Sequence, residues 1–167
     1  MIILFIEYAA ASDFNERVSC SIKAAIEYNI PADILLSIAE IENGKPGEAI
    51  LNSNGTVDIG VMQFNSTYLK DLAKYGITDK HVAVSGCYPY RLAAWRIRQH
   101  LLHDKGSIWQ RSANYHSYTR TYNEHYQERI KERSPKWISW LTERYPIKEW
   151  NPSDEIYDGE IPILSLK

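Results

Sequence analysis

The sequence predicts a mainly α-helical (α+β) domain in which a small β-hairpin lies beside a cleft. Two observations favour this class. Apolar residues recur at helical spacing over most of the chain, whereas residues 52–65 combine a tight-turn signal with a short extended pattern. With 167 residues, of which 44% are hydrophobic and 24% charged, the chain has enough material for one sizeable core. We therefore expect a single globular domain.

The N-terminal segment is expected to consist of a targeting remnant followed by a first helix. Residues 1–11 resemble the end of a secretory signal, because a short apolar run precedes a small-residue Ala9-x-Ala11 pattern. A basic start is missing, and Glu7 interrupts the apolar run. The segment is also far too short to span a bilayer, and no other stretch could span one, so no stable membrane insertion is expected. The first helix covers residues 14–29, where Val18, Ile22 and Ala25 share one face.

The next helix, after Pro31, carries the residue on which the functional interpretation depends. At about 100° per residue its apolar positions form one stripe, which consists of Ile34, Leu35, Ile38, Ala39 and Ile41. Glu42 falls near the middle of this stripe, whereas Glu40 points to the opposite side and into water. A carboxyl group among apolar side chains is expected to have a raised pKa, which suits a general acid. The alternative is that the helix has ended and Glu42 has already turned into solvent.

The segment after this helix predicts one wall of a cleft. Gly44, Pro46 and Gly47 end the helix. Asn54-Gly55 is a strong tight-turn signal, and Gly60, in the short extended stretch beyond it, allows close approach of another backbone. A helix that ends in Glu, a Gly-rich turn and a small β element together make a cleft wall.

Further helices are expected over residues 66–75, 90–103, 107–114 and 119–132. On the second of these, Arg91, Arg96 and Arg98 are assigned to the solvated face. His100 and His103 have a spacing that could bind a metal ion, but no Cys or acidic partner falls in register. We therefore predict no metal site and no cofactor.

Charge and composition limit the partners and divide the chain. The net charge of −2 implies no general affinity for nucleic acid or anionic membranes. From residue 134 the composition shifts towards Trp, Pro and acidic residues, which include Trp137, Trp140 and Trp150. Residues 134–167 are therefore interpreted as a C-terminal extension. The extension could wrap back over the domain, dock a partner or stay partly disordered.

Four ordered motifs carry a resemblance to a known family. They are Ala39–Glu42, Asn54–Thr56 with Asp58–Asn65, Ala113–Ser117 in a Tyr-His-Ser form, and Asn123 with Tyr126. Together they resemble the soluble-type lytic transglycosylase domain, especially the small specialised members attached to secretion systems, conjugation machines and type IV pili. The resemblance spans about Cys20 to Ile130 and implies a lysozyme-like domain over residues 12–133. It is specific because the motifs occur together and in order.

The resemblance implies a periplasmic enzyme that cleaves peptidoglycan glycan strands and locally opens the wall for an envelope-spanning apparatus. Glu42 would act first as general acid and then as general base towards the C6 hydroxyl of N-acetylmuramic acid (MurNAc). The product would be a 1,6-anhydro sugar, and no water would be consumed. Asp58 has two interpretations: it stabilises positive charge, as a second acid does in lysozymes, or it holds the turn through bonds to its own backbone.

The resemblance also implies a set of substrate-binding positions. Asn43 stands where the family usually has a Ser that helps to hold substrate. Tyr115 is expected to orient Glu42 by a hydrogen bond, and Tyr126 either lines the cleft or packs in the core. The full expected set is Asn43, Gly60, Val61, Met62, Gln63, Tyr115 and Tyr126.

The two cysteines, Cys20 and Cys87, are either buried thiols or, in an exported protein, a disulfide. The resemblance favours the disulfide, because the specialised branch often has Cys at both places. Two other functions stay open: a muramidase that uses water, and a wall-binding assembly subunit with little turnover. A third alternative gives the main role to the C-terminal extension, which truncation after Arg133 would test.

Overall fold

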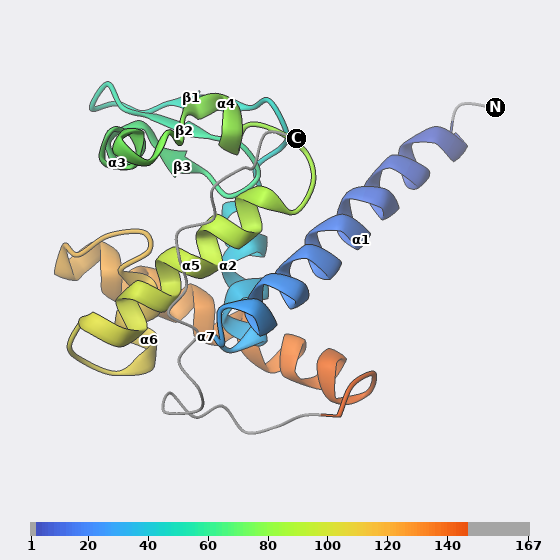
Figure 1. Ribbon diagram of the computed structural model, residues 1–167. Helices are drawn as coiled ribbons and strands as arrows, with labels where there is room; N and C mark the ends of the chain where they lie inside the picture. Colours follow the sequence, from blue (N-terminus) through green and yellow to red (C-terminus); the bar gives the residue numbers. More distant parts are fainter. Residues whose placement is uncertain (1–2, 147–167) are drawn as a thin grey trace.

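The computed structural model of the chain describes residues 3–146, with side chains from Phe14 onward, and it confirms the mainly α-helical α+β class (Figure 1). A group of helices forms the larger part, and a small antiparallel sheet with two short helices lies at one end of it. The helices of the larger part are α1 (Ile3–Glu27), α2 (Ala32–Glu42), α5 (Tyr88–His103), α6 (Ile108–Ala113) and α7 (Arg120–Thr142). The smaller part contains β1 (Ala49–Leu51), β2 (Val57–Ile59), β3 (Phe64–Asn65), α3 (Ser66–Leu72), a 3-10 turn (Ala73–Tyr75) and α4 (Asp79–Val82).

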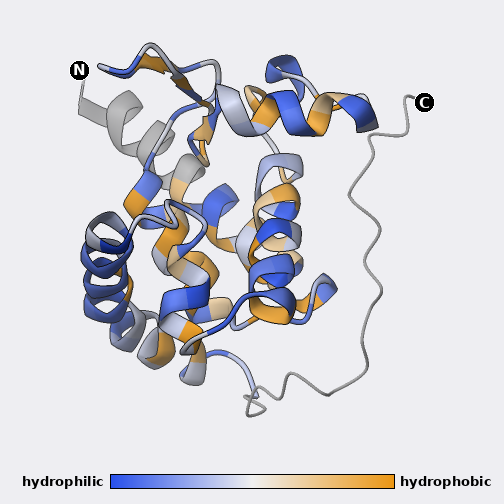
Figure 2. Cartoon of the chain, turned by 90° about the vertical axis from the view of Figure 1, so that its left-hand side faces the viewer, coloured by the Kyte–Doolittle hydropathy of each residue, from blue (hydrophilic) through white to orange (hydrophobic). Residues whose placement is uncertain are grey.

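Helix α2 lies at the centre of the fold, packed against α1, α5 and α7. Its predicted apolar stripe is buried, and Leu35 and Ile38 are completely inaccessible to solvent. The other helices carry hydrophobic and hydrophilic residues in alternating bands, as amphipathic helices do (Figure 2). Within the described residues, no helix is both long enough and apolar enough to cross a membrane.

The sheet has the strand order β1-β2-β3, and both pairs are antiparallel. Gly55 adopts a φ of +80° at the tip of the β1–β2 turn, as the Asn-Gly signal predicts. At Gly60, a Cβ atom would lie 2.0 Å from the backbone oxygen of Val82, so this position accepts only glycine. The predicted close backbone approach is therefore confirmed, and it fixes the sheet against α4.

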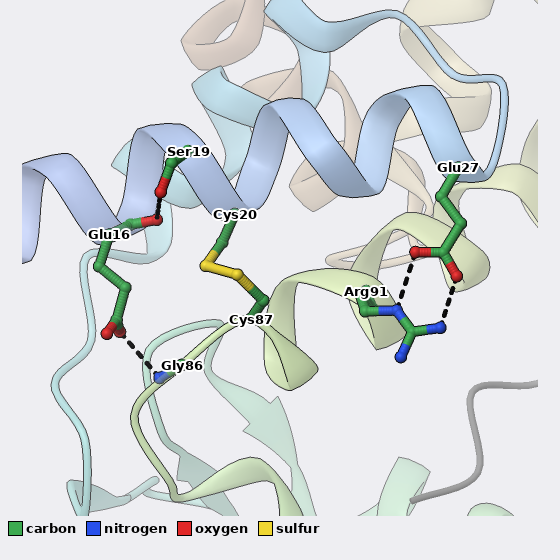
Figure 3. Close-up of a disulfide and its surroundings, with 7 residues drawn as sticks. All are labelled: Glu16, Ser19, Cys20, Glu27, Gly86, Cys87 and Arg91. Atoms are coloured by element: carbon green, nitrogen blue, oxygen red, sulfur yellow. Dashed lines mark hydrogen bonds and ion pairs between the residues drawn. A yellow bond between two sulfur atoms is a disulfide. The ribbon is translucent and has the colours of Figure 1, made fainter.

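A disulfide joins Cys20 of α1 to Cys87, the residue before α5, with their Cα atoms 4.8 Å apart (Figure 3). The predicted pairing is confirmed. Polar contacts flank it on both sides: Glu16 accepts a 2.9 Å hydrogen bond from the Gly86 amide, and Arg91 Nε donates to Glu27 at 2.8 Å. Closing a loop of this length stabilises the fold by roughly 4 kcal/mol in the chain-entropy model.

Helix α7 is longer than the sequence pattern indicates. The helix expected over residues 119–132 continues through Pro135 to Thr142. Ser134 Oγ donates to Asp33 at 2.6 Å, and the Trp137 side chain is buried with Leu141 in a second apolar cluster against α1 and α2. These contacts offset the cost of an internal proline, about 3 kcal/mol. A truncation after Arg133 would therefore remove core side chains as well as the end of the chain.

The structure describes the two ends of the chain only in part. Residues 3–11 of the expected signal remnant belong to α1, which begins well before the predicted Phe14, while residues 1–2 lie outside the described residues. Residues 147–167 of the expected C-terminal extension, including Trp150, also lie outside them. The signal remnant and the division at residue 134 therefore stay predictions.

The assignment of arginines on α5 to the solvated face is wrong for Arg96 and Arg98, whereas the Arg91 side chain is 39% exposed. Arg98 is only 2% exposed and donates to the Asn29 carbonyl at 3.0 Å. Arg91 is paired with Glu27, and Arg96 lies over aromatic rings next to the cleft described below. Because α1, α2, α4 and α6 all pack against α5, much of the surface of this helix is covered.

Candidate functional site

Glu42 is the last residue of α2 and lies at the wall of a cleft of about 430 Å³. The helix ends at once, because Asn43 adopts a left-handed φ of 46°. The cleft runs between the sheet and the α6–α7 region. Its lining is polar, and it consists of Glu42, Asn52, Ser53, Asn54, Thr56, Asp58, Gln63, Asn65, Arg96, Tyr115, His116, Ser117 and Tyr122.

The Glu42 carboxyl has the raised pKa that the sequence predicts. Burial raises the pKa from its ordinary value of 4.5 to about 7, and the nearby Asp58 charge contributes in the same direction. The Tyr126 hydroxyl and the positive charges of Arg129 and Arg96 oppose this rise but do not cancel it. Part of the Glu42 side chain nevertheless stays open to the cleft.

The hydrogen bond to Glu42 comes from Tyr126 of α7, not from Tyr115 as expected. Tyr126 Oη donates to Glu42 Oε1, and the ring is 1% exposed beneath the parallel ring of His116, 4.7 Å away. Tyr115 Oη instead donates to the backbone oxygen of Met62 at 2.7 Å. The reason is the direct packing of α7 along α2, which brings Tyr126 to the end of α2.

Asp58 lies on β2 and faces the same cleft as Glu42. Its two carboxylate oxygens accept hydrogen bonds from side-chain amides, one from Asn52 at 2.9 Å and one from Asn65 at 2.8 Å. Asn65 is its register partner on β3. The expected alternative, an Asp bonded to the backbone of its own turn, is not what the structure shows. Asp58 is instead part of a polar wall made by side chains of β2, of β3 and of the residue that follows β1.

The expected substrate-binding positions separate into three groups: two residues that line the cleft, four that are buried behind it, and Asn43, which does neither. Gln63 and Tyr115 line the cleft, and Gln63 Nε2 is fixed by a 2.8 Å hydrogen bond to the Gly60 oxygen. Val61 and Met62, like Tyr126, are buried behind the lining. Gly60 is also buried.

Asn43 does not line the cleft. Its Oδ1 accepts a 3.0 Å hydrogen bond from Arg17 of α1, so its side chain is engaged on the other side of the helix end. The left-handed backbone conformation of Asn43 turns the side chain away from Glu42.

Sequence reasoning missed several residues that line the cleft, above all Arg96 and Tyr122. Tyr122 is 63% exposed and precedes Tyr126 by one helical turn, so the i, i+4 relation on α7 could have placed both near the site. Arg96 gave no such signal, because the pattern of an amphipathic helix does not distinguish an arginine that lines a cleft from one that faces solvent.

The arrangement combines one proton donor that titrates near neutral pH with many uncharged hydrogen-bonding groups. This combination suits a sugar chain, whose linking oxygen needs a proton to leave. In the described part of the chain, no group of three or more His, Cys, Asp and Glu side chains is placed to hold a metal ion.

No family model matches the chain, but comparison with known proteins gives relatives. The chain is 30% identical over 132 residues to the invasion protein IagB of Salmonella typhimurium, an alignment that covers 78% of this chain and 72% of IagB. It is 33% identical over 87 residues to protein IpgF of Shigella flexneri, which covers 52% of this chain and 57% of IpgF. The chain thus spans little more than half the length of IpgF.

Proposed function

The chain belongs to the specialised branch of the lytic transglycosylase-like family that contains the invasion protein IagB and protein IpgF, and from this premise we propose that it is a peptidoglycan lytic transglycosylase. It would cleave the β-1,4 bond between MurNAc and N-acetylglucosamine (GlcNAc). The observation that carries the proposal is Glu42, a carboxyl group with a pKa of about 7 on the wall of a polar cleft.

In the first step, protonated Glu42 donates its proton to the glycosidic oxygen of a strand lying in the cleft. The bond to C1 of MurNAc breaks and positive charge develops at that carbon. The substrate's own N-acetyl group assists by sharing this charge. Because Tyr126 donates to Glu42 Oε1, the other oxygen, Oε2, is the one left for the proton that is transferred.

In the second step, the Glu42 carboxylate takes the proton of the C6 hydroxyl of the same sugar, and the C6 oxygen attacks C1. A 1,6-anhydroMurNAc end forms, and Glu42 regains its proton. The reaction consumes no water, and one carboxyl group serves both steps. A pKa near 7 suits such a double role, since neither protonation state is strongly disfavoured at neutral pH.

The polar wall is proposed to hold the strand. Asp58 lies where its negative charge would stabilise the developing positive charge, and Asn52 and Asn65 keep its oxygens in place. Gln63 would bind an N-acetyl or hydroxyl group, and the exposed ring of Tyr122 offers a face on which a sugar ring can stack.

The setting of the enzyme is proposed from the family and the disulfide. Disulfides form and persist outside the reducing cytoplasm, which supports a periplasmic location. There the enzyme would open the wall locally for a secretion, conjugation or pilus apparatus, whose components are its expected partners. Residues 12–133 would be the transglycosylase domain in this scheme.

Product analysis tests the proposal. Purified sacculi are incubated with the protein, and the masses of the released muropeptides are measured, with Glu42→Gln as the inactive control. We expect anhydroMurNAc ends from the wild type and no release by the variant. Release of products by Glu42→Gln at the wild-type rate would refute the assigned role of Glu42.

The second candidate is a muramidase, and the observation that favours it is the presence of Asp58 in the same cleft as Glu42. With two carboxylates available, water could take the place of the C6 hydroxyl. Reducing MurNAc ends in the same experiment would establish this reaction instead.

A wall-binding assembly subunit with little turnover is the third candidate. In that case Glu42→Gln would leave both sacculus binding and assembly of the apparatus intact. Failure of assembly in cells that carry Glu42→Gln would exclude this purely structural role.

A further inference from the structure

Arg96 is the positively charged side chain of the cleft lining, and it is held between aromatic rings. Its guanidinium carbon lies 3.9 Å from the ring centre of Tyr68 and 4.8 Å from that of Tyr115. Phe64 supports both rings, at centroid distances of 6.2 and 6.3 Å. The guanidinium thus lies against two ring faces, which restrict its position.

No carboxylate forms an ion pair with Arg96 within residues 14–146, and Glu42 acts on its charge only at longer range. Its Nε is buried and makes no hydrogen bond there, whereas Arg91 on the same helix forms an ion pair with Glu27. The acid of the cleft wall opposite, Asp58, has both oxygens engaged by asparagine amides. One donor of the Arg96 guanidinium has therefore lost water without gaining a hydrogen bond, which costs free energy.

We propose that Arg96 binds a carboxylate carried by the substrate and thereby makes the cleft selective for acidic glycan strands over neutral ones. This inference rests on the proposed function. Guanidinium and carboxylate groups match in shape and can form two parallel hydrogen bonds. Because the rings already hold the guanidinium flat, little side-chain entropy is lost when the anion binds.

Two kinds of carboxylate in a peptidoglycan strand have the required chemistry. One is the lactyl group on C3 of MurNAc in strands without peptides, and the others belong to the stem peptide when the lactyl group is amide-linked. Both are carried by the substituent on C3 of the same sugar. Chains of GlcNAc alone have neither.

A binding experiment with defined oligosaccharides tests the proposal and separates the two sources. The probes are GlcNAc–MurNAc oligomers in three forms: with free lactyl carboxylates, with the lactyl groups converted to amides, and with stem peptides. Binding to the full chain carrying Glu42→Gln is measured by calorimetry at low salt, so that the probes stay intact. We expect at least one acidic form to bind about tenfold more tightly than the amide form, and added salt to reduce this preference.

Variants of Arg96 test whether this residue causes the preference for the acidic probes. Arg96→Gln should lose it while binding the amide form as before, and Arg96→Lys should retain part of it. Arg120→Gln is the matched control, because Arg120 is an exposed arginine paired with Glu124 away from the cleft lining. It should keep the full preference.

The outcomes distinguish the inference from the proposed function. Equal affinity for acidic and amide forms would overturn the assignment of Arg96 and leave the transglycosylase proposal intact. A preference that survives in Arg96→Gln would also overturn it. If no oligosaccharide binds and sacculi are not cleaved, the proposed function fails and the inference fails with it. If Arg96→Gln does not fold, Arg96→Lys takes its place, and an undiminished preference in that variant would overturn the assignment.

Discussion

The two acidic side chains at the end of α2 have opposite environments, although only one residue separates them. Glu40 forms hydrogen bonds with Lys136 at 2.7 and 2.8 Å and with Trp137 Nε1 at 2.8 Å, and these contacts outweigh partial burial and lower its pKa. Glu42 faces the cleft, where burial outweighs its contact with Tyr126 and raises its pKa to about 7. One helix, α7, supplies both sets of partners.

The difference teaches that the kind of partner decides the role of each carboxyl group. An ammonium group beside a carboxylate stabilises the charged form strongly, which makes Glu40 a structural ion-pair residue. A neutral tyrosine hydroxyl stabilises it only weakly, so Glu42 keeps its affinity for a proton. The C-terminal part of α7 anchors the helix end, and the N-terminal part tunes the acid.

The largest expected effect comes from exchanging each acid for its amide. Glu42→Gln should lower the rate of muropeptide release by about a thousandfold, because the proton donor is lost. Glu40→Gln should leave the rate within about twofold of the wild type. Both are measured on purified sacculi at pH 6. Similar rates for the two variants would remove the functional distinction between the two residues.

Removing Trp137 should weaken the contacts around Glu40 and leave those around Glu42 unchanged. Trp137 is 3% exposed and packs against Leu36, so Trp137→Ala is expected to cost about 3–5 kcal/mol of stability. The pKa of Glu40 should rise at the same time, since one hydrogen-bond donor is lost. Urea unfolding measures the first effect and NMR titration the second. A loss below about 1 kcal/mol would mean that residues 134–142 contribute little to the core.

The stability of the protein should depend on pH through Glu42 in a predictable direction. Folded Glu42 binds its proton more tightly than the unfolded chain does, so its contribution is retained at low pH and lost as pH rises from 4.5 through about 7. The loss relative to Glu42→Gln should reach on the order of 3 kcal/mol. Urea unfolding of both proteins at pH 5 and pH 8 measures it. Parallel curves would show that Glu42 has an ordinary pKa.

Tyr126→Phe should change the pKa and the orientation of the Glu42 carboxyl group without removing that group. Loss of the hydroxyl takes away a contact that lowers the pKa of Glu42, so the pKa should rise further. The alkaline limb of the pH–rate profile should then move to higher pH, while the rate at the optimum falls about tenfold because the carboxyl is less well oriented. Tyr122→Phe, one turn away and exposed, serves as control. A limb that moves to lower pH would contradict the assigned role of Tyr126.

The smallest effect is expected for Lys136→Met. The ion pair with Glu40 is partly exposed, so its loss should reduce stability by less than about 1 kcal/mol. The pKa of Glu40 should nevertheless rise, whereas that of Glu42 should not change. NMR titration checks both. A matching shift at Glu42 would mean that the two sides of the helix end are coupled.

Much of this organisation was predictable from local patterns. The stripe on α2 located Glu42, and the Asn-Gly turn together with Gly60 located the cleft wall. The resemblance gave the Cys20–Cys87 pair. These features depend on residues that are close in sequence or on motifs with fixed order.

Contacts between distant segments were not predictable in the same way. Either Tyr115 or Tyr126 could supply a hydroxyl to Glu42, and only the packing of α7 along α2 decides between them. The continuation of α7 through Pro135 depends on Asp33 and Glu40, which lie about a hundred residues earlier. Arg96 was misassigned for the same reason, since its aromatic partners come from other elements.

The central claim is that Glu42 stays protonated at a pH where an ordinary carboxyl group is ionised. NMR titration of the ¹³C-labelled glutamate carboxyl groups, with Glu42→Gln and Glu40→Gln to assign the signals, tests it most directly. The account predicts a midpoint of about 7 for Glu42 and a midpoint below 4.5 for Glu40. A Glu42 midpoint at or below 4.5 would contradict it.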